Sequence, residues 1–82
     1  MSRPRVFRAV PRDDGRWEVR ADDEPRARAT YATQALAWRQ AKDLARFADA
    51  GMAVLHNRDG GTRTEHVYRR GGGLYPAPAA TG

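Results

Sequence analysis

The chain of 82 residues contains no cysteine, which excludes disulfide bonds and thiolate chemistry. It also lacks any apolar run near the roughly 20 residues that a membrane span requires. The N-terminal stretch MSRPRVFRAV has basic residues but no apolar segment behind them, so it does not resemble a secretory signal. We therefore expect a cytoplasmic protein with no membrane partner.

Groups that perform catalysis or bind metals are scarce. His56 and His66 are the only imidazoles, whereas a metal site needs three or four converging ligands. No Ser or Thr stands beside a His and an acid in a recognisable order, and RRGGGLYP lacks the Lys-Ser/Thr of a phosphate-binding loop. We predict that the protein is not an enzyme and has no metal, no cofactor and no small-molecule substrate.

Charge is plentiful, and it is unevenly distributed. The formal net charge is +5, and Lys42 is the only lysine among 15 basic residues. Residues 1–12 contain four Arg and no acid, residues 13–24 contain six acids against two Arg, and residues 25–46 contain five bases against one acid. The net charge favours acidic partners such as nucleic acid, but a uniformly basic DNA-coating protein would not show these alternating blocks.

Alternation and turn residues predict the order β-β-(β)-α-β-β, an α+β fold. The strands expected are RVFRAVPR, RWEVRA, a weaker RARATYA, MAVLHNRD and TRTEHVYR. We expect an antiparallel sheet with one Ala-rich helix on one face. Residues 1–71 would form this single domain. Residues 72–82 would be a flexible Gly/Pro/Ala tail, in which Leu74, Tyr75 and Pro76 could instead dock onto the domain or a partner.

The helix is expected between Thr33, a plausible N-cap, and Gly51, a plausible residue just beyond the C-terminus. At about 100° per residue, one face is apolar, and Leu36 and Phe47 extend one edge of it. Its small alanines indicate a helix that lies close against the sheet. The residues of the apolar face are Ala37, Trp38, Ala41, Leu44, Ala45 and Ala48.

The second hairpin has no unique register in the sequence. Its loop could be Asp59-Gly60, Gly60-Gly61 or Gly60-Gly61-Thr62, and each choice pairs the flanking strands differently. With a three-residue loop, His56 and His66 could face each other, although ordinary hairpin histidines are the simpler interpretation.

The pieces VPRDDGRWEV, ATQALAWRQAKDLA and VLHNRDG, in this order and spacing, resemble the small bacterial and phage proteins of domain-of-unknown-function family 2188. The resemblance covers about residues 6–61 and implies a fold but no activity. Its motif of a Val-Pro strand end, Gly turn, Trp-x-Val strand, Thr-capped helix and His-x-Arg-Asp-Gly turn falls on Val10, Pro11, Gly15, Trp17, Val19, Thr33, His56, Arg58, Asp59 and Gly60.

In the first hairpin, the hydrophobic pattern selects a three-residue loop, Asp13-Asp14-Gly15. One face then holds Phe7, Ala9, Pro11, Trp17, Val19 and Ala21 as core. The other face carries the candidate binding residues, with Arg8 opposite Arg20 and Arg12 opposite Arg16. Like charges directly opposite destabilise a sheet, and Glu18 should relieve only part of this. The candidate binding residues are Val6, Arg8, Val10, Arg12, Arg16 and Arg20.

Apolar residues on both faces of the first strand favour a protein-interaction module, because a sheet covered on one face should be polar on the other. It would bind a protein partner or itself through the outer sheet face, for example as a phage or mobile-element accessory factor. The alternative is a nucleic-acid-binding module that uses the arginines of the first hairpin. A third reading is a small stable domain whose role depends on genomic context.

Overall fold

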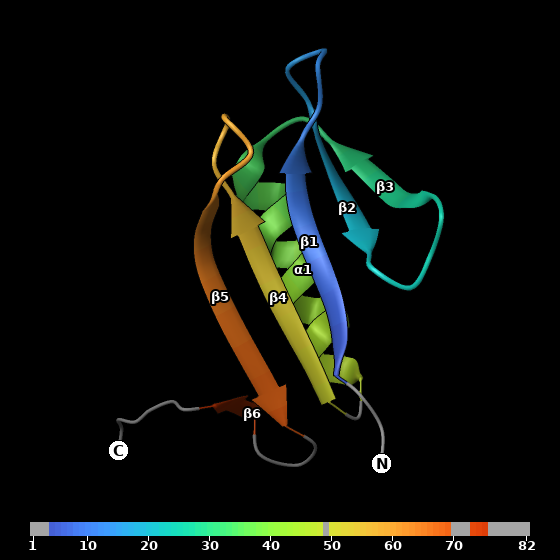
Figure 1. The fold of residues 1–82 in the computed structure, drawn as a ribbon, viewed down its shortest axis with the longest axis vertical. Helices are drawn as coiled ribbons and strands as arrows, with labels where there is room; N and C mark the ends of the chain where they lie inside the picture. The colour runs from blue at the N-terminus through green and yellow to red at the C-terminus, as the bar shows by residue number, and fades with distance from the viewer. Residues whose placement is uncertain (1–3, 49, 70–72, 76–82) are drawn as a thin grey trace.

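The computed structural model describes residues 4–48, 50–69 and 73–75. These form one helix and one six-stranded sheet (Figure 1). Along the sheet the strands lie in the order β3-β2-β1-β4-β5-β6. The elements are β1 (Arg5–Pro11), β2 (Trp17–Ala21), β3 (Ala27–Tyr31), α1 (Gln34–Phe47), β4 (Ala50–His56), β5 (Thr62–Arg69) and β6 (Gly73–Tyr75).

The sheet is mixed, so the expectation of a wholly antiparallel sheet is wrong. The α+β class and the helix on one face are confirmed, but β1 and β4 pair in parallel at the centre of the sheet. The cause is the helix. β3 leads into α1, which runs back along the sheet, and β4 then starts in the same direction as β3 and β1. Parallel neighbours need a crossover of this kind.

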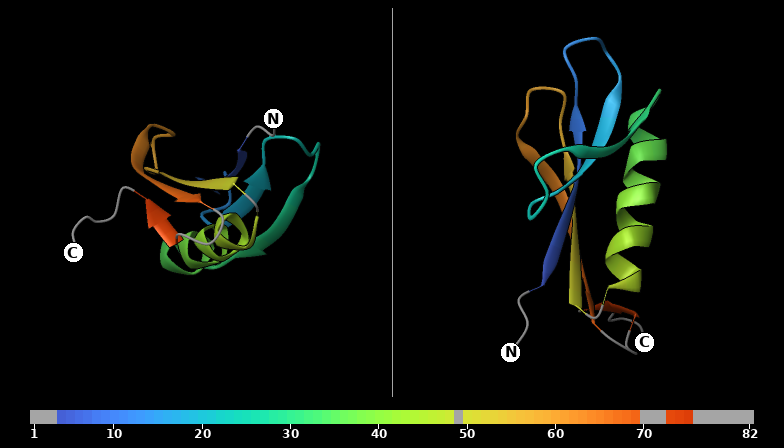
Figure 2. Two further views of the ribbon diagram at one scale, coloured as in Figure 1. Left: turned by 90° about the horizontal axis from the view of Figure 1, so that it is seen from below. Right: turned by 90° about the vertical axis from the view of Figure 1, so that its right-hand side faces the viewer.

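The helix covers one face of the sheet only (Figure 2). Its N-cap is Thr33 as predicted, since the Thr33 hydroxyl accepts a hydrogen bond from the Leu36 amide at 3.2 Å. The predicted buried face is confirmed: Ala37, Ala41 and Ala45 are fully buried, with Trp38, Leu44 and Ala48 packed at their margin.

Three details of the helix prediction are wrong. The helix ends at Phe47, with Ala48 as its C-cap in an extended conformation. Gly51 is therefore not a helix-terminating residue but a buried residue of β4, where a Cβ would collide with the carbonyl of Ala45. Leu36 and Phe47 are 48% and 80% exposed rather than lining the core, because both lie on the helix side that faces away from the sheet.

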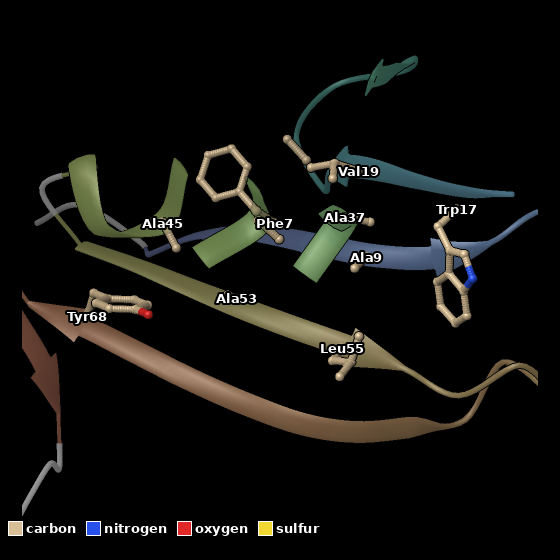
Figure 3. Close-up of a cluster of buried hydrophobic side chains, with 11 residues drawn as sticks. Phe7, Ala9, Trp17, Val19, Ala37, Ala45, Ala53, Leu55 and Tyr68 are labelled. Carbon is tan, nitrogen blue, oxygen red and sulfur yellow. The ribbon is translucent and has the colours of Figure 1, made fainter. Parts of the chain in front are cut away.

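The core lies between α1 and the central strands (Figure 3). Trp17, Phe7 and Val19 are its largest fully buried side chains. The small alanines of the helix let it approach closely, so one layer of large side chains on the sheet fills the gap. The prediction that Trp17 and Trp38 share a core is confirmed, with Trp38 at its edge.

The second hairpin uses none of the three predicted loops. The Gly60 amide donates to the Asn57 carbonyl at 2.9 Å, and the Asn57 amide donates to the Gly61 carbonyl at 2.7 Å. Gly60 has φ +94, so the loop is Arg58-Asp59-Gly60. β5 carries one extra residue near the turn, where the register shifts between Leu55 and His56.

Part of the expected tail is a strand. Gly73–Tyr75 forms β6 and pairs antiparallel with β5, with Tyr68 opposite Leu74. Residues 73–75 of the expected tail therefore form a strand at the edge of the sheet. The rest of the expected tail, residues 72 and 76–82, lies outside the described residues.

Candidate binding surface

The first hairpin forms with the predicted turn and register. Gly15 has φ +87, its amide donates to the Arg12 carbonyl at 3.2 Å, and the Arg12 amide donates to the Arg16 carbonyl at 2.8 Å. This is a type I turn followed by a left-handed glycine. Five predicted pairs are confirmed as register partners: Pro11–Trp17, Val10–Glu18, Ala9–Val19, Arg8–Arg20 and Phe7–Ala21. Arg12 and Arg16, the sixth predicted pair, are joined by the backbone hydrogen bond just described.

This register places Val6, Arg8, Val10, Arg12 and Arg20 on the face that α1 does not cover, which we call the outer face. Figure 1 views the molecule from this side, with the helix behind the sheet. Arg16 stands at the edge of the loop and is exposed. Its guanidinium has no carboxylate within 4.0 Å among the described residues, and its backbone amide donates to Asp14 at 3.0 Å.

Three of the four candidate arginines, Arg8, Arg12 and Arg20, are paired with carboxylates of the same chain. We call these three the arginine row; the sequence pattern did not reveal their pairing. Arg8 binds Asp22 through two hydrogen bonds, from Nε to Oδ1 at 2.7 Å and from the terminal nitrogen to Oδ2 at 3.0 Å. Arg12 binds Asp14 at 3.2 Å, and Arg20 binds Glu18 at 3.2 Å.

Glu18 is the centre of this charge pairing. It is only 9% exposed, and it lies between Arg20 and Arg12, whose guanidinium is 3.8 Å away. A buried carboxylate is costly unless charges and hydrogen bonds compensate it. Three arginines and three carboxylates thus balance on this part of the face. The expected repulsion of Arg8 and Arg20 is relieved because each has its own acid, and Asp22 is the partner that sequence reasoning missed.

Beside these ion pairs, the outer face carries a group of apolar side chains. We define the outer strip as five residues that run over β1, β4 and β5: Val6, Val10, Met52, Val54 and Val67. Val6 pairs in register with Met52, and Met52 with Val67. Val54 is 1% exposed although it is not part of the core cluster under the helix. The other four are partly exposed.

Only Val6 and Val10 of the outer strip were predicted. The signal for Met52 and Val54 is the unbroken apolar run GMAVL in β4. A half-exposed strand alternates polar and apolar residues, whereas a strand that is buried on both faces reads as a continuous apolar run. Ala53 and Leu55 face the helix, so Met52 and Val54 must face outward.

The two hairpin loops are linked on the same side of the molecule. The Arg58 guanidinium lies 5.1 Å from the centre of the Trp17 ring and donates to the Gly15 carbonyl at 3.3 Å. A cation over an indole is attracted by the ring electrons. Arg58 of the second loop therefore covers the main core residue of the first hairpin.

His56 extends this link along the outer face. Arg8 donates to Nε2 of His56 at 3.1 Å, and Nδ1 of His56 lies 2.9 Å from the Gly60 carbonyl. Arginine can only donate, so Nε2 accepts and Nδ1 carries the proton that binds Gly60. The resulting chain of hydrogen bonds, Asp22–Arg8–His56–Gly60, connects the end of β2 to the turn of the second hairpin.

His56 and His66 do not face each other, since His56 pairs with Thr62 and His66 with Ala53. His66 lies under the helix, with its ring 5.2 Å from that of Trp38. Burial and the nearby Lys42 charge lower its pKa from the ordinary 6.5. Among the described residues, no cluster of three or more potential ligands could hold a metal ion, and no described helix is long and apolar enough to cross a membrane.

The geometry gives four residues of the family motif a clear structural role. Gly15 and Gly60 supply the two positive φ angles, Thr33 caps the helix, and Asp59 accepts the Gly61 amide at 2.9 Å. Comparison with curated proteins and with solved structures finds no similar protein. The model of the family described as "Uncharacterized protein conserved in bacteria (DUF2188)" matches residues 7–68, and the chain therefore belongs to this bacterial family.

Proposed function

We propose that this protein is a protein-interaction module, and that it binds its partner through the outer strip. The observation behind this proposal is that Met52, Val6 and Val67 adjoin one another on a face that no described element covers. Interfaces between proteins typically have an apolar centre and a polar rim. Here the strip is the centre, and the ion pairs of β1 and β2 form one rim.

The charge pairing supports this proposal over nucleic-acid binding. Phosphate binding depends on cations that can exchange their counterions for phosphates. Arg8, Arg12 and Arg20 are already paired with carboxylates, so a polyanion would have to compete with three internal acids. A protein surface, by contrast, gains from covering the apolar strip and leaves the ion pairs intact.

The test is site-specific photo-crosslinking in the cells that naturally produce the protein. A benzophenone amino acid replaces Met52 in one variant and Leu36, which is 48% exposed on the helix, in the matched control. We expect a covalent adduct with a polypeptide from position 52 and none from position 36. Equal adducts from both positions, or none from position 52, would contradict the proposal.

Nucleic acid is the alternative that a second measurement decides. We expect the purified protein not to bind duplex DNA or RNA of mixed sequence at low salt. Binding that weakens steeply as salt is added would instead show phosphate contacts. If Arg8→Ala with Arg20→Ala abolished that binding, the arginine row would be the nucleic-acid site and the interaction proposal would fail.

A further inference from the structure

We infer that the partner of the outer strip is a second copy of this chain, and that the two copies stack outer face on outer face. This inference rests on the proposed function and names its partner. Three observations support it: the position of an outward carboxylate on β5, the pairing of the strip residues across β1 and β4, and the size of the face.

The first observation is charge complementarity across the face. Glu65 on β5 pairs with Val54 and therefore faces outward; it is exposed and has no ion pair within 4.0 Å among the described residues. On the other side of Val54 lies Arg8 of β1, and Arg20 of β2 lies beyond Arg8. The terminal nitrogens of Arg20 bind Glu18 and the Pro25 carbonyl, and its Nε has no hydrogen-bond partner among the described residues.

A twofold axis parallel to the strands, between β1 and β4, brings these groups together. It places β5 of one copy over β2 of the other, because the strand order is β2-β1-β4-β5. Glu65 then approaches Arg20 of the second copy. Symmetry makes the contact occur twice, as in any isologous interface. The negative charge of Glu65 on one side of the strip and the positive charge of Arg20 on the other thus complement a second copy of the same surface.

The apolar residues fit the same axis. Val6 and Met52 are register partners on β1 and β4, so the rotation sets Val6 of each copy over Met52 of the other. Stacked sheets lie about 10 Å apart with strands within about 30° of each other. The molecule measures 39 × 26 Å across its two longer dimensions, which leaves room for the ~800 Å² that each partner buries in an ordinary stable interface.

Sedimentation equilibrium of the full chain tests the inference. We expect a monomer–dimer equilibrium that Met52→Lys weakens at least tenfold in dissociation constant. Leu36→Lys, on the exposed helix side, is the matched control and should leave the constant unchanged. Melting curves below the dissociation constant show whether each variant is folded. If Met52→Lys unfolds the monomer, Val6→Lys takes its place in the same comparison.

The orientation of the two copies has its own test. Glu65→Lys should weaken the dimer at least tenfold, whereas Asp43→Lys, with the same charge change on the helix, should not. The native chain has no cysteine, so in a single-cysteine variant any crosslink must form at the introduced residue. A bis-maleimide with a spacer of about 10 Å, the distance between stacked sheets, should link Met52→Cys chains into dimers but leave Arg39→Cys chains monomeric.

The possible results separate this inference from the proposed function. A chain that stays monomeric at every concentration overturns the second copy as partner. The proposed function then survives only if position 52 still crosslinks to a different polypeptide in cells. A dimer that Leu36→Lys breaks and Met52→Lys does not would place the interface on the helix, and would overturn the inference.

Discussion

The two hairpins use the same turn but present different surfaces. In both, a type I turn ends in a glycine with positive φ, at Gly15 and Gly60. In both, the preceding Asp accepts the amide two residues on, at 3.0 Å for Asp14 and 2.9 Å for Asp59. The two turns thus have the same geometry although the strands on either side of them display different residues.

Outside the turn the hairpins diverge. The outward side of β1 and β2 is covered by ion pairs of Arg8, Arg12 and Arg20. The outward side of β4 and β5 carries Met52, Val54, Glu65 and Val67, and no ion pair shorter than 4.0 Å is found among these described residues. The charged groups on the outward side of the first hairpin are thus paired within the chain, whereas the outward side of the second hairpin carries three apolar side chains and one carboxylate without an ion pair among the described residues.

The largest loss of stability should follow when the main core residue of either hairpin is truncated. Trp17 is 2% exposed and Leu55 is 6% exposed. Trp17→Ala should destabilise the fold by roughly 3–5 kcal/mol and Leu55→Ala by roughly 2–5 kcal/mol, through lost burial and a cavity. Denaturant unfolding measures both. An unchanged unfolding midpoint for Trp17→Ala would contradict the role of this ring as the anchor of the core.

Because the two turns are equivalent, replacing Gly15 or replacing Gly60 should lower the stability of the fold by the same amount. A Cβ at Gly15 or Gly60 would meet no atom within 4 Å, so Gly→Ala at either position costs only the left-handed conformation, about 1–2 kcal/mol. Gly→Asn should recover part of that loss, because Asn tolerates this region better. Costs that differ by more than about 1 kcal/mol would show that the loops are not equivalent.

Smaller effects should follow from removing one arginine of the first hairpin. Arg8→Met keeps an aliphatic side chain but leaves Asp22 and His56 without this partner. Both ends of the ion pair are about a third to a half exposed, so we expect a loss of about 0.2–1 kcal/mol that shrinks at high salt. A variant that melts higher than the wild type would restore the view that Arg8 and Arg20 chiefly repel each other.

The smallest effect should be a difference in pH dependence. His66 of the second hairpin has a lowered pKa, so the unfolded chain binds its proton first as pH falls below about 6.5. Stability is complete above that pH and declines below it. The His66→Phe variant should lack this decline, as measured by melting temperature between about pH 7 and pH 5. An identical decline in the variant would exclude His66 as its source.

The first hairpin and the loop after it respond at lower pH. Hydrogen bonds from Arg16 and Arg12 to Asp14, from Arg5 to Asp23 and from Arg28 to Glu24 lower the pKa values of these carboxyl groups from 3.8 or 4.5. These carboxylates contribute fully to the stability of the fold above their ordinary pKa values. The contribution is lost as pH falls through the lowered pKa values. Acid should therefore weaken the two hairpins in separate pH ranges.

The sequence by itself determined the features that depend on near neighbours. Alternation and the Asp-Gly turn specified the first hairpin to the residue, because a slip by one residue would have moved Arg8 and Arg12 into the core. The spacing of Ala37, Ala41 and Ala45 likewise specified the buried helix face. The continuous apolar run of β4 also indicates that Met52 and Val54 lie on the face opposite Ala53 and Leu55.

Tertiary structure decided the features that join distant segments. The parallel pairing of β1 with β4 follows from the path of the helix, which no local pattern encodes. Arg8 meets Asp22 and His56 only because β1 lies between β2 and β4. In the second hairpin, both Gly60 and Gly61 tolerate positive φ, so local preference could not choose the loop. There the pairing of Asn57 with Gly61 and the His56–Gly60 contact select it, because they satisfy polar groups that a different register would leave without partners.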